Sequence, residues 1–279
     1  DLEPRLYTSA PTGLNFVAVA YSASQGGVLF DPSVPLEDAN VDIDGPALAY
    51  VRSLGLWDKA AKFDALLPHA CLDGYATFNG AIVTRDVCGY ADPRFRLSVN
   101  FHGAPALAPR EFAAFEQDFI VGASVQITAP WGQYDDDRLV NIGTNRWSIK
   151  PEIGLSKNLE HIAFEMAAAV TLYDDNDDFV NGTLQIDPIY SLQTHVVHVF
   201  KRGAWLAGDA THYRGGRSTV GDSSRDDLQE NWRLGVTFGM PLSRNQTLRV
   251  HASSGVSTRT GTDFDTVAVA WQFRWVSGS

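Results

Sequence analysis

The residue types that could support catalysis are present, but their spacing does not suit it. His195 and His198 are the closest histidine pair, and a spacing of three on a strand places them on opposite faces, so they cannot share a metal ion. His102 and His251 have serines nearby in sequence, yet no motif fixes a nucleophile, a base and an orienting carboxylate. The chain contains neither a Gly-x-Ser-x-Gly elbow nor a His-Glu-x-x-His motif. We therefore expect no catalytic residue, no metal site and no cofactor.

Acidic residues gather in three runs, at 135–137, 174–178 and 222–230. Clustered carboxylates suit Ca²⁺, but residues 174–178 lack the spacing and the glycine of an EF-hand loop. We interpret the runs as a solvated acidic rim that divalent cations could bridge to surface lipid. The net charge of −11 argues against a nucleic-acid partner, because such partners select basic surfaces.

Cys71 and Cys88 flank a stretch rich in Gly, Asp, Asn and Thr. An even number of cysteines around such a stretch suggests a disulfide formed in an oxidising compartment, and two unrelated thiols are the alternative. The chain opens with neither a basic start nor an apolar segment. We expect from this either a cytosolic protein or the mature form of an exported one.

The elements that would carry these residues are strands, because apolar and polar residues alternate. Every second residue from Phe95 to Phe101 is apolar, and the same period recurs within 146–155, 232–240 and 247–257. No run of 18 apolar residues exists, which excludes a transmembrane helix. We place strands at 13–23, 45–54, 60–70, 94–104, 117–129, 144–155, 160–173, 184–199, 203–214, 230–240, 247–258 and 264–275.

The connections between these strands alternate in length. Tight turns at 57–59, 157–158, 201–203 and 243–245 alternate with long connections at 24–44, 71–93, 130–143, 174–183 and 215–229. This pattern and an even strand count are typical of a transmembrane barrel. The long connection at 104–116, with one expected helical turn, departs from the pattern. A soluble β-sandwich is the rival, but the last strand ends in Trp275, as the last strand of outer-membrane barrels usually ends in an aromatic residue.

The predicted fold is therefore all-β: a single transmembrane antiparallel up-and-down β-barrel of about 12 strands. We assign residues 1–12 to an N-terminal segment, 13–275 to the barrel and 276–279 to a tail that could derive from cloning.

Several stretches of the sequence are distinctive, and they are Leu29-Phe30-Asp31-Pro32, Gly103-Ala104-Pro105-Ala106-Leu107, Pro130-Trp131-Gly132-Gln133-Tyr134-Asp135, Asn141-Ile142-Gly143-Thr144-Asn145-Arg146-Trp147, Pro151-Glu152-Ile153-Gly154-Leu155-Ser156, Asp187-Pro188-Ile189-Tyr190 and Gly215-Gly216. Together they resemble one family of outer-membrane channels, often labelled meta-pathway phenol-degradation proteins, which includes channels implicated in uptake of hydrophobic compounds such as sphingosine. The resemblance covers most of the chain and includes the irregular connection at 104–116. It implies a monomeric barrel in the Gram-negative outer membrane that transports small hydrophobic or aromatic molecules, in contact with the bilayer and lipopolysaccharide.

Charged residues on the strands must face the lumen, because Arg or Lys at the lipid midplane costs about 2–4 kcal/mol. They could form a constriction that selects solutes, or a structural ion-pair network that fills the barrel. The candidates are Arg96, Arg146, Lys150, Glu152, Glu165, Asp187, Arg233, Arg249 and Arg274.

Two other features bear on the path of a solute. Pro68, Pro151 and Pro188 each remove a ladder donor, which could create a lateral opening or merely local curvature. The apolar residues Leu2, Leu6 and Tyr7 suggest that the N-terminal segment enters and narrows the lumen, the alternative being a free tail. The predicted function is passive uptake of small hydrophobic or aromatic molecules. A narrow general porin, an outer-membrane barrel enzyme and a structural barrel are the alternatives.

Overall fold

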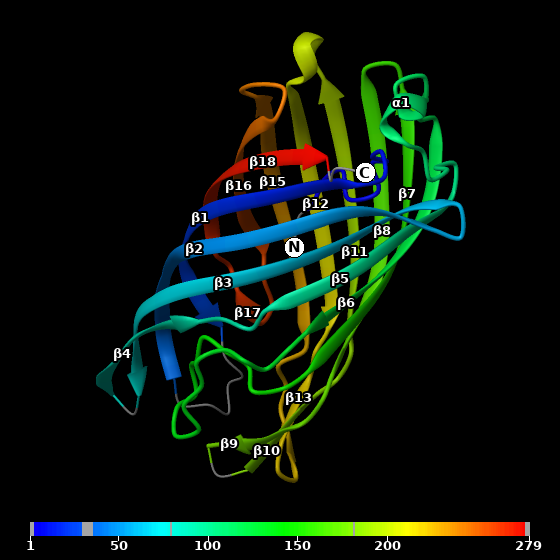
Figure 1. The fold of residues 1–279 in the computed structure, drawn as a ribbon. Coiled ribbons are helices and arrows are strands. Elements are labelled where there is room, and N and C mark those ends of the chain that lie inside the picture. The colour runs from blue at the N-terminus through cyan, green and yellow to red at the C-terminus, as the bar shows by residue number, and fades with distance from the viewer. Residues whose placement is uncertain (1–2, 30–35, 79, 181, 277–279) are drawn as a thin grey trace.

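The computed structural model describes residues 3–29, 36–78, 80–180 and 182–276. Twelve long strands form one antiparallel barrel, which closes where the first strand pairs with the last (Figure 1). The predicted all-β barrel of twelve strands is confirmed. The barrel strands are β1 (Leu14–Leu29), β2 (Leu36–Leu56), β3 (Lys59–Phe78), β5 (Arg94–His102), β6 (Phe119–Thr128), β7 (Ser148–Leu159), β8 (Ile162–Tyr173), β11 (Ile189–Val199), β12 (Trp205–Gly215), β15 (Gln229–Pro241), β16 (Gln246–Ser257) and β18 (Asp265–Val276).

Shorter elements lie at the two ends of the barrel. The helical ones are α1 (Pro109–Phe112) and the 3₁₀ turn η1 (Lys201–Gly203). Neither of these, among the described residues, is long and apolar enough to cross a membrane. The remaining strands are β4 (Ala81–Tyr90), which pairs with β3, β17 (Gly261–Thr262), which pairs with β1, and β9 (Asn176–Phe179), β10 (Gly182–Ile186), β13 (Ser218–Val220) and β14 (Ser223–Ser224), which form a separate small sheet.

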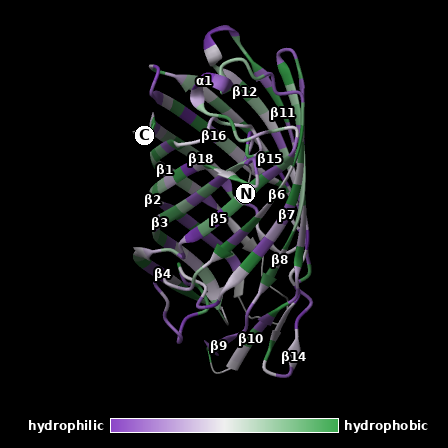
Figure 2. Ribbon diagram, turned by 45° about the vertical axis from the view of Figure 1, so that its right-hand side comes forward, coloured by the Kyte–Doolittle hydropathy of each residue, from purple (hydrophilic) through white to green (hydrophobic). Residues whose placement is uncertain are grey.

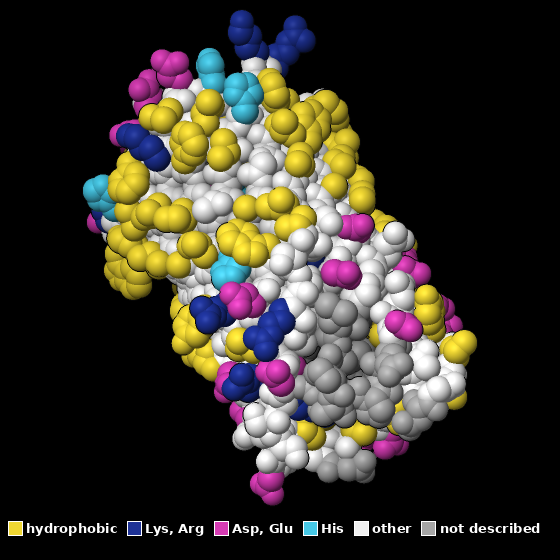
Figure 3. All heavy atoms as spheres, turned by 180° about the vertical axis from the view of Figure 1, so that it is seen from behind, with side chains coloured by type: hydrophobic (Ala, Val, Ile, Leu, Met, Phe, Trp, Pro, Cys, Tyr) yellow, Lys and Arg dark blue, Asp and Glu magenta, His cyan; other side chains and the backbone are white. Residues whose placement is uncertain are grey.

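The outer wall of the barrel is apolar because alternate side chains of each strand point outward. Val19 of β1 lies in register with Leu48 of β2 and Trp271 of β18, and its side chain is 49% exposed. Strand ribbons alternate between hydrophobic and hydrophilic residues along their length (Figure 2). In the space-filling view, hydrophobic side chains cover a broad band of the surface, and charged side chains gather mostly outside it (Figure 3). Such a band is the surface that a bilayer covers.

The two ends of the barrel differ in their connections. Tight turns join β2 to β3 and β7 to β8, and Trp57 and Asp58 in the first of these have φ of 51° and 58°. The start of β1 and the end of β18 also lie at this end, since Leu14 pairs with Val276. In outer-membrane barrels short turns face the periplasm and long loops face outward. The connection at 104–116, which carries α1, lies at the tight-turn end as an exception.

Two of the predicted long loops are wrong, because strands occupy much of 24–44 and most of 71–93. β3 continues to Phe78, and β4 pairs with it from Ala81 to Tyr90. Leu72 is buried and Asp73 beside it is exposed, so buried and exposed side chains still alternate here, although many of the residues are polar or glycine. Gly, Asp and Thr give this hairpin the composition of a loop, because the hairpin extends past the apolar band and needs no apolar outer face.

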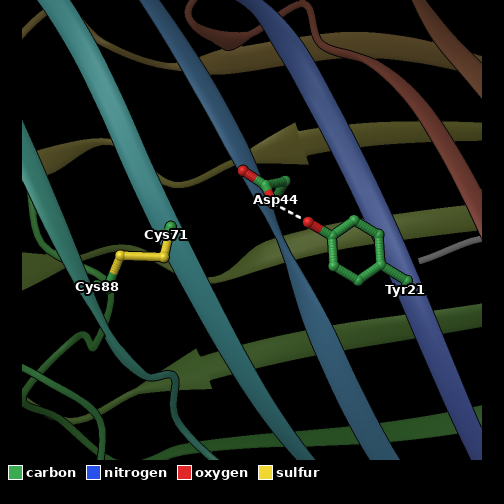
Figure 4. The surroundings of a disulfide bond; sticks show 4 residues. All are labelled: Tyr21, Asp44, Cys71 and Cys88. Atoms are coloured by element: carbon green, nitrogen blue, oxygen red, sulfur yellow. Dashed lines mark hydrogen bonds between the residues drawn. A yellow bond between two sulfur atoms is a disulfide. The ribbon is translucent and has the colours of Figure 1, made fainter.

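The predicted disulfide between Cys71 and Cys88 is present and joins directly paired residues of β3 and β4 (Figure 4). On the neighbouring strands, the hydroxyl of Tyr21 donates a hydrogen bond to Asp44, which is paired with Cys71. These contacts tie the extended parts of β1 to β4 into one sheet beyond the barrel band.

Two boundaries also differ from the prediction. The segment 184–199 is not one strand, because β10 ends at Ile186 and β11 starts at Ile189 in a different sheet. Pro188 therefore lies between two strands, where its missing N–H is tolerated. At the other boundary, β18 runs one residue past 275, because Val276 pairs with Leu14, and residues 277–279 lie outside the described residues.

Candidate channel interior

The N-terminal segment (residues 3–12) lies against the inward faces of several barrel strands. Tyr7 is 4% exposed, and its hydroxyl donates a 2.9 Å hydrogen bond to Glu152 of β7. The ring lies where side chains at Gly122 and Gly154 would otherwise stand: a Cβ at position 154 would come within 2.0 Å of the Tyr7 ring. Leu6 packs on the small cluster around Tyr7, and Leu2 lies outside the described residues.

Polar contacts hold the same segment on neighbouring strands of the wall, from β3 to β8. The backbone N–H of Arg5 donates to Glu165 of β8 at 2.6 Å, and Asn100 of β5 donates to the carbonyl of Tyr7 at 2.9 Å. Lys62 of β3 donates to the carbonyls of Leu6 and Thr8. Buried backbone groups that would be costly if unpaired therefore find partners on the wall.

Glu3 is the carboxylate of this segment that meets the cations of the wall. It forms an ion pair with Arg96 of β5, which also pairs with Asp64 of β3 at 3.0 Å. Burial by itself would raise the pKa of Glu3, but Arg96 and Arg94 outweigh burial and hold that pKa below its usual range. Glu3 is therefore a charged carboxylate at neutral pH.

Two cavities occupy the rest of the barrel interior. The outer cavity, near the long loops, has a volume of about 770 Å³, and the inner cavity, near the tight turns, has a volume of about 1040 Å³. Glu3 and His251 line both. These two side chains therefore mark the boundary between the cavities, and the sequence patterns did not single out either one for this position.

The inner cavity has an apolar wall on one side. Small or apolar inward side chains of β1, β2, β3 and β18 form it, and no other part of the described interior cavities shows such a run. These strands supply Phe16, Ala18, Ala49, Val51, Leu66, Ala268 and Ala270. On the other side, Trp205 of β12 lies under the guanidinium groups of Arg5 and Arg249, at 5.4 and 5.8 Å from the ring centre. This arrangement places apolar surface beside fixed positive charge.

The predicted lumen residues fall into five groups. Lys150 and Arg233 line the outer cavity, and Arg96, Arg249 and Arg274 line the inner cavity. Glu152 and Glu165 are buried against the N-terminal segment, and Lys150 lies 3.5 Å from Glu152. Arg146 precedes β7 and stacks on Tyr173 at 5.0 Å. Asp187 is exposed in the link between β10 and β11, outside the barrel strands.

A polar row across four strands was missed in the sequence analysis. Nδ1 of His195 lies 2.6 Å from Asp209, and the hydroxyl of Thr237 donates to the other oxygen of Asp209 at 2.9 Å. Thr237 also lies 2.9 Å from Nδ1 of His251. The alternation that begins at Trp205 would have placed Asp209 inward. His195 is buried and His198 is exposed, as the spacing of three requires.

Two of the three singled-out prolines interrupt barrel ladders. β3 pairs with β5 as far as Leu66, then with β4 from His69, and Pro68 lies in the break. The pairing of β7 with β8 passes from Ile149 directly to Glu152, so Pro151 has no partner in the described β7–β8 ladder, although it pairs with Val125 of β6. Both interruptions follow from the missing N–H of proline.

Comparison with solved structures shows the same fold. The COG4313 outer membrane channel from Pseudomonas putida F1 superposes with a TM-score of 0.82 at 20% identity, covering 99% of this chain and 100% of that one. The P. putida toluene transporter TodX gives a TM-score of 0.52 at 11% identity over 96% and 92% of the two chains. The β domain of the Bordetella autotransporter BrkA gives 0.54 at 11% identity over 94% and 100%. At these identities the likeness concerns the fold.

Comparison with curated proteins finds no match. The family model described as "Putative MetA-pathway of phenol degradation" matches residues 23–273, which is nearly the whole barrel. The resemblance seen in the sequence is confirmed, and the chain belongs to this family.

Proposed function

We propose that this protein is an outer-membrane channel for passive uptake of small hydrophobic or aromatic molecules. The observation that carries the proposal is the apolar wall of the inner cavity, inside a barrel whose outer band is also apolar. A general porin has a polar, water-filled lumen, and an apolar wall would not help hydrophilic solutes to pass. Two solved barrels of the same fold, the COG4313 outer membrane channel and the toluene transporter TodX, support the proposal.

Planar-bilayer recording with apolar solutes tests this function. The purified chain should give small conductances that toluene or a long-chain amine blocks reversibly. A large steady conductance that ignores such solutes would support a general porin instead. Absence of both conductance and solute uptake into liposomes would support a structural barrel.

We also propose that the N-terminal segment narrows the lumen as a plug, through Leu2, Leu6 and Tyr7. Its contacts with β3, β5, β7 and β8 support this role, since they anchor it inside the barrel along one continuous arc of the wall. Deleting residues 1–10 should raise single-channel conductance severalfold. An unchanged conductance in a correctly folded deletion variant would contradict the plug.

A solute could leave the lumen sideways, and we propose Pro68 as the centre of such an exit, with Pro151 and Pro188 as further candidates. The ladder breaks at Pro68 next to Arg94, and Arg94 lines the outer cavity. Pro151 opens a shorter break, and Pro188 lies outside the barrel strands. Replacing Pro68 by Ala should slow uptake of an apolar solute and leave ion conductance unchanged. Equal uptake by this variant would indicate local curvature only.

We propose that the channel works as a monomer in contact with lipopolysaccharide. Asp42, Asp73 and Asp86 are directly paired across β2, β3 and β4 and are exposed. Like charges directly opposite each other destabilise a sheet, and divalent cations shared with lipid phosphates would offset this repulsion. In lipopolysaccharide-containing vesicles, EDTA should lower the melting temperature of the wild type more than that of a triple Asp→Asn variant. Light scattering in detergent should give the mass of one chain.

A catalytic role has less support than transport. The Asp209–His195 pair resembles part of a hydrolase triad, but its hydrogen bonds continue to Thr237 and His251 rather than to an exposed nucleophile. We infer that this row stabilises the inward face of the barrel. An assay for ester hydrolysis by wild type and His195→Ala in the same detergent would reveal any such activity.

A further inference from the structure

The charges that line the channel are almost all positive, although the protein as a whole is acidic. Among the described residues, three Lys or Arg side chains line the outer cavity and seven more line the inner cavity, of 22 in the chain. Among the described Asp and Glu residues, Glu3 and Asp64 are the ones that line either cavity, while Glu152 and Glu165 are buried against the N-terminal segment. The acidic residues instead gather on the outer loops. A narrow space lined by one sign of charge concentrates solutes of the opposite sign.

The outer cavity also supplies aromatic surface beside its cations. Arg94, Lys150 and Arg233 line it together with Tyr173 and Tyr213. Below it, past Glu3 and His251, the apolar wall of the inner cavity faces Arg249. A solute that passes both cavities therefore meets positive charge and apolar surface side by side at each stage.

Resting on the proposed channel function, we propose that the preferred solute is an organic anion, a carboxylate carried on an aromatic or alkyl body. Such a molecule can satisfy the guanidinium and ammonium groups with its carboxylate and the apolar wall with its body. A neutral hydrocarbon gains nothing from the positive charge of the two cavities, and a small hydrophilic anion leaves the apolar wall without a contact.

Glu3 occupies the place that such a carboxylate would take. Its carboxylate is paired with Arg96, and Arg94 and Lys150 contribute attraction to it. The N-terminal segment thus places the carboxylate of Glu3 at the boundary between the cavities. An incoming carboxylate competes with Glu3 for these cations, which couples solute binding to release of the segment.

Four matched solutes test the proposal on the full chain in planar bilayers at pH 8, where an ordinary histidine is neutral. Benzoate, benzamide and benzamidinium share one shape and differ in charge, and acetate keeps the charge without the ring. A KCl gradient should give an anion-selective reversal potential. Benzoate should block at a concentration about fivefold lower than benzamide does, the gain expected of one partly exposed ion pair, and benzamidinium and acetate should be weaker still.

Substitutions assign the effect to the cavity. Arg233→Gln and Lys150→Gln should each abolish most of the preference for benzoate over benzamide, and Glu3→Gln should increase it. Lys201→Gln removes the same charge from an exposed position of η1, outside both cavities, and should leave the preference unchanged. Heat-modifiable mobility in gels verifies that each barrel is folded.

The outcomes separate this inference from the channel function. Cation selectivity, or block by benzamide at the same concentration as benzoate, would overturn the preference for anions while the channel itself stands. If acetate and benzoate block equally well, the proposal that the solute needs an apolar body is wrong. If none of the four solutes changes the current, and liposomes containing the protein take up none of them, both the channel function and the inference fall.

Discussion

At the scale of single residues, the interior depends on which side chains are missing as much as on which are present. Gly122 and Gly154 are paired on the neighbouring strands β6 and β7, the ring of Tyr7 lies over both, and neither has room for a Cβ. Tyr7 in turn reaches Glu152, whose second oxygen accepts a hydrogen bond from Gln193 at 3.0 Å. The glycines thus determine where the N-terminal segment can lie.

Gly154→Ala should therefore displace Tyr7 and loosen the segment. Because the new Cβ would stand 2.0 Å from the ring, we expect a loss of about 1–3 kcal/mol in stability and a higher single-channel conductance. Gly208→Ala on β12 is the matched control, since nothing lies within 4 Å of the Cβ that it adds. If both variants conduct like the wild type, Tyr7 does not control the pore.

At the scale of elements, the connection after β6 covers the place where β4 and β5 meet. The carboxylate of Asp92 accepts hydrogen bonds from the N–H groups of Gly132 and Thr144, at 2.8 Å each, and from the hydroxyl of Thr144 at 2.7 Å. Asp92 is buried and lies in the break at Pro68. One side chain thus holds a long connection over the proposed lateral exit.

Replacing Asp92 by Ala should release this connection. Three donors lose a charged acceptor, each worth about 1.5–3 kcal/mol, so limited proteolysis should cut within 130–147 at least tenfold faster. Asp86→Ala, on the exposed face of β4, serves as the control and should be cut at the wild-type rate. The lateral-exit proposal also expects faster uptake of an apolar solute by Asp92→Ala.

The disulfide acts on the β3–β4 hairpin rather than on the barrel. Its cysteines are 17 residues apart, and closing a loop of that size contributes about 3 kcal/mol. In the Cys71→Ser, Cys88→Ser variant, amide exchange should accelerate in residues 69–90 and stay unchanged in β11, β12 and β15. Faster exchange throughout the barrel would mean that the hairpin is needed for the whole fold.

At the scale of the whole molecule, the outward face of every barrel strand must meet lipid. Val19 and Ala18 are adjacent on β1, with Val19 exposed on the outer band and Ala18 lining the inner cavity. Val19→Arg should cost about 2–4 kcal/mol of stability in lipid vesicles, because it places a charge against hydrocarbon. Ala18→Arg should be tolerated and should lower conductance instead. Urea-induced unfolding in vesicles measures both, and equal stabilities would contradict the assignment of faces.

The sequence predicts a feature well when neighbouring residues decide it, and poorly when contacts between distant segments decide it. Alternation within 94–103 or 264–275 identifies a strand and its two faces, because side-chain direction depends only on position along the strand. The extended hairpin around Cys71 was read as a loop, since alternation between polar residues and glycine leaves little contrast. Glu3 and His251 both line the cavity boundary because residues 3–12 fold into the closed barrel, which no local pattern encodes.

The amino-acid sequence alone determined the strand count, the apolar outer face, the disulfide pairing and the family, all of which rest on local periodicity or on motifs. Only the tertiary structure decided the path of residues 3–12, the partition of the interior into two cavities and the gathering of positive charge along them. The physical reason is closure: once twelve strands bend into a barrel, side chains that point the same way converge on one space. The net charge and the volume of the barrel interior depend on all twelve strands together, and no single segment of the sequence determines them.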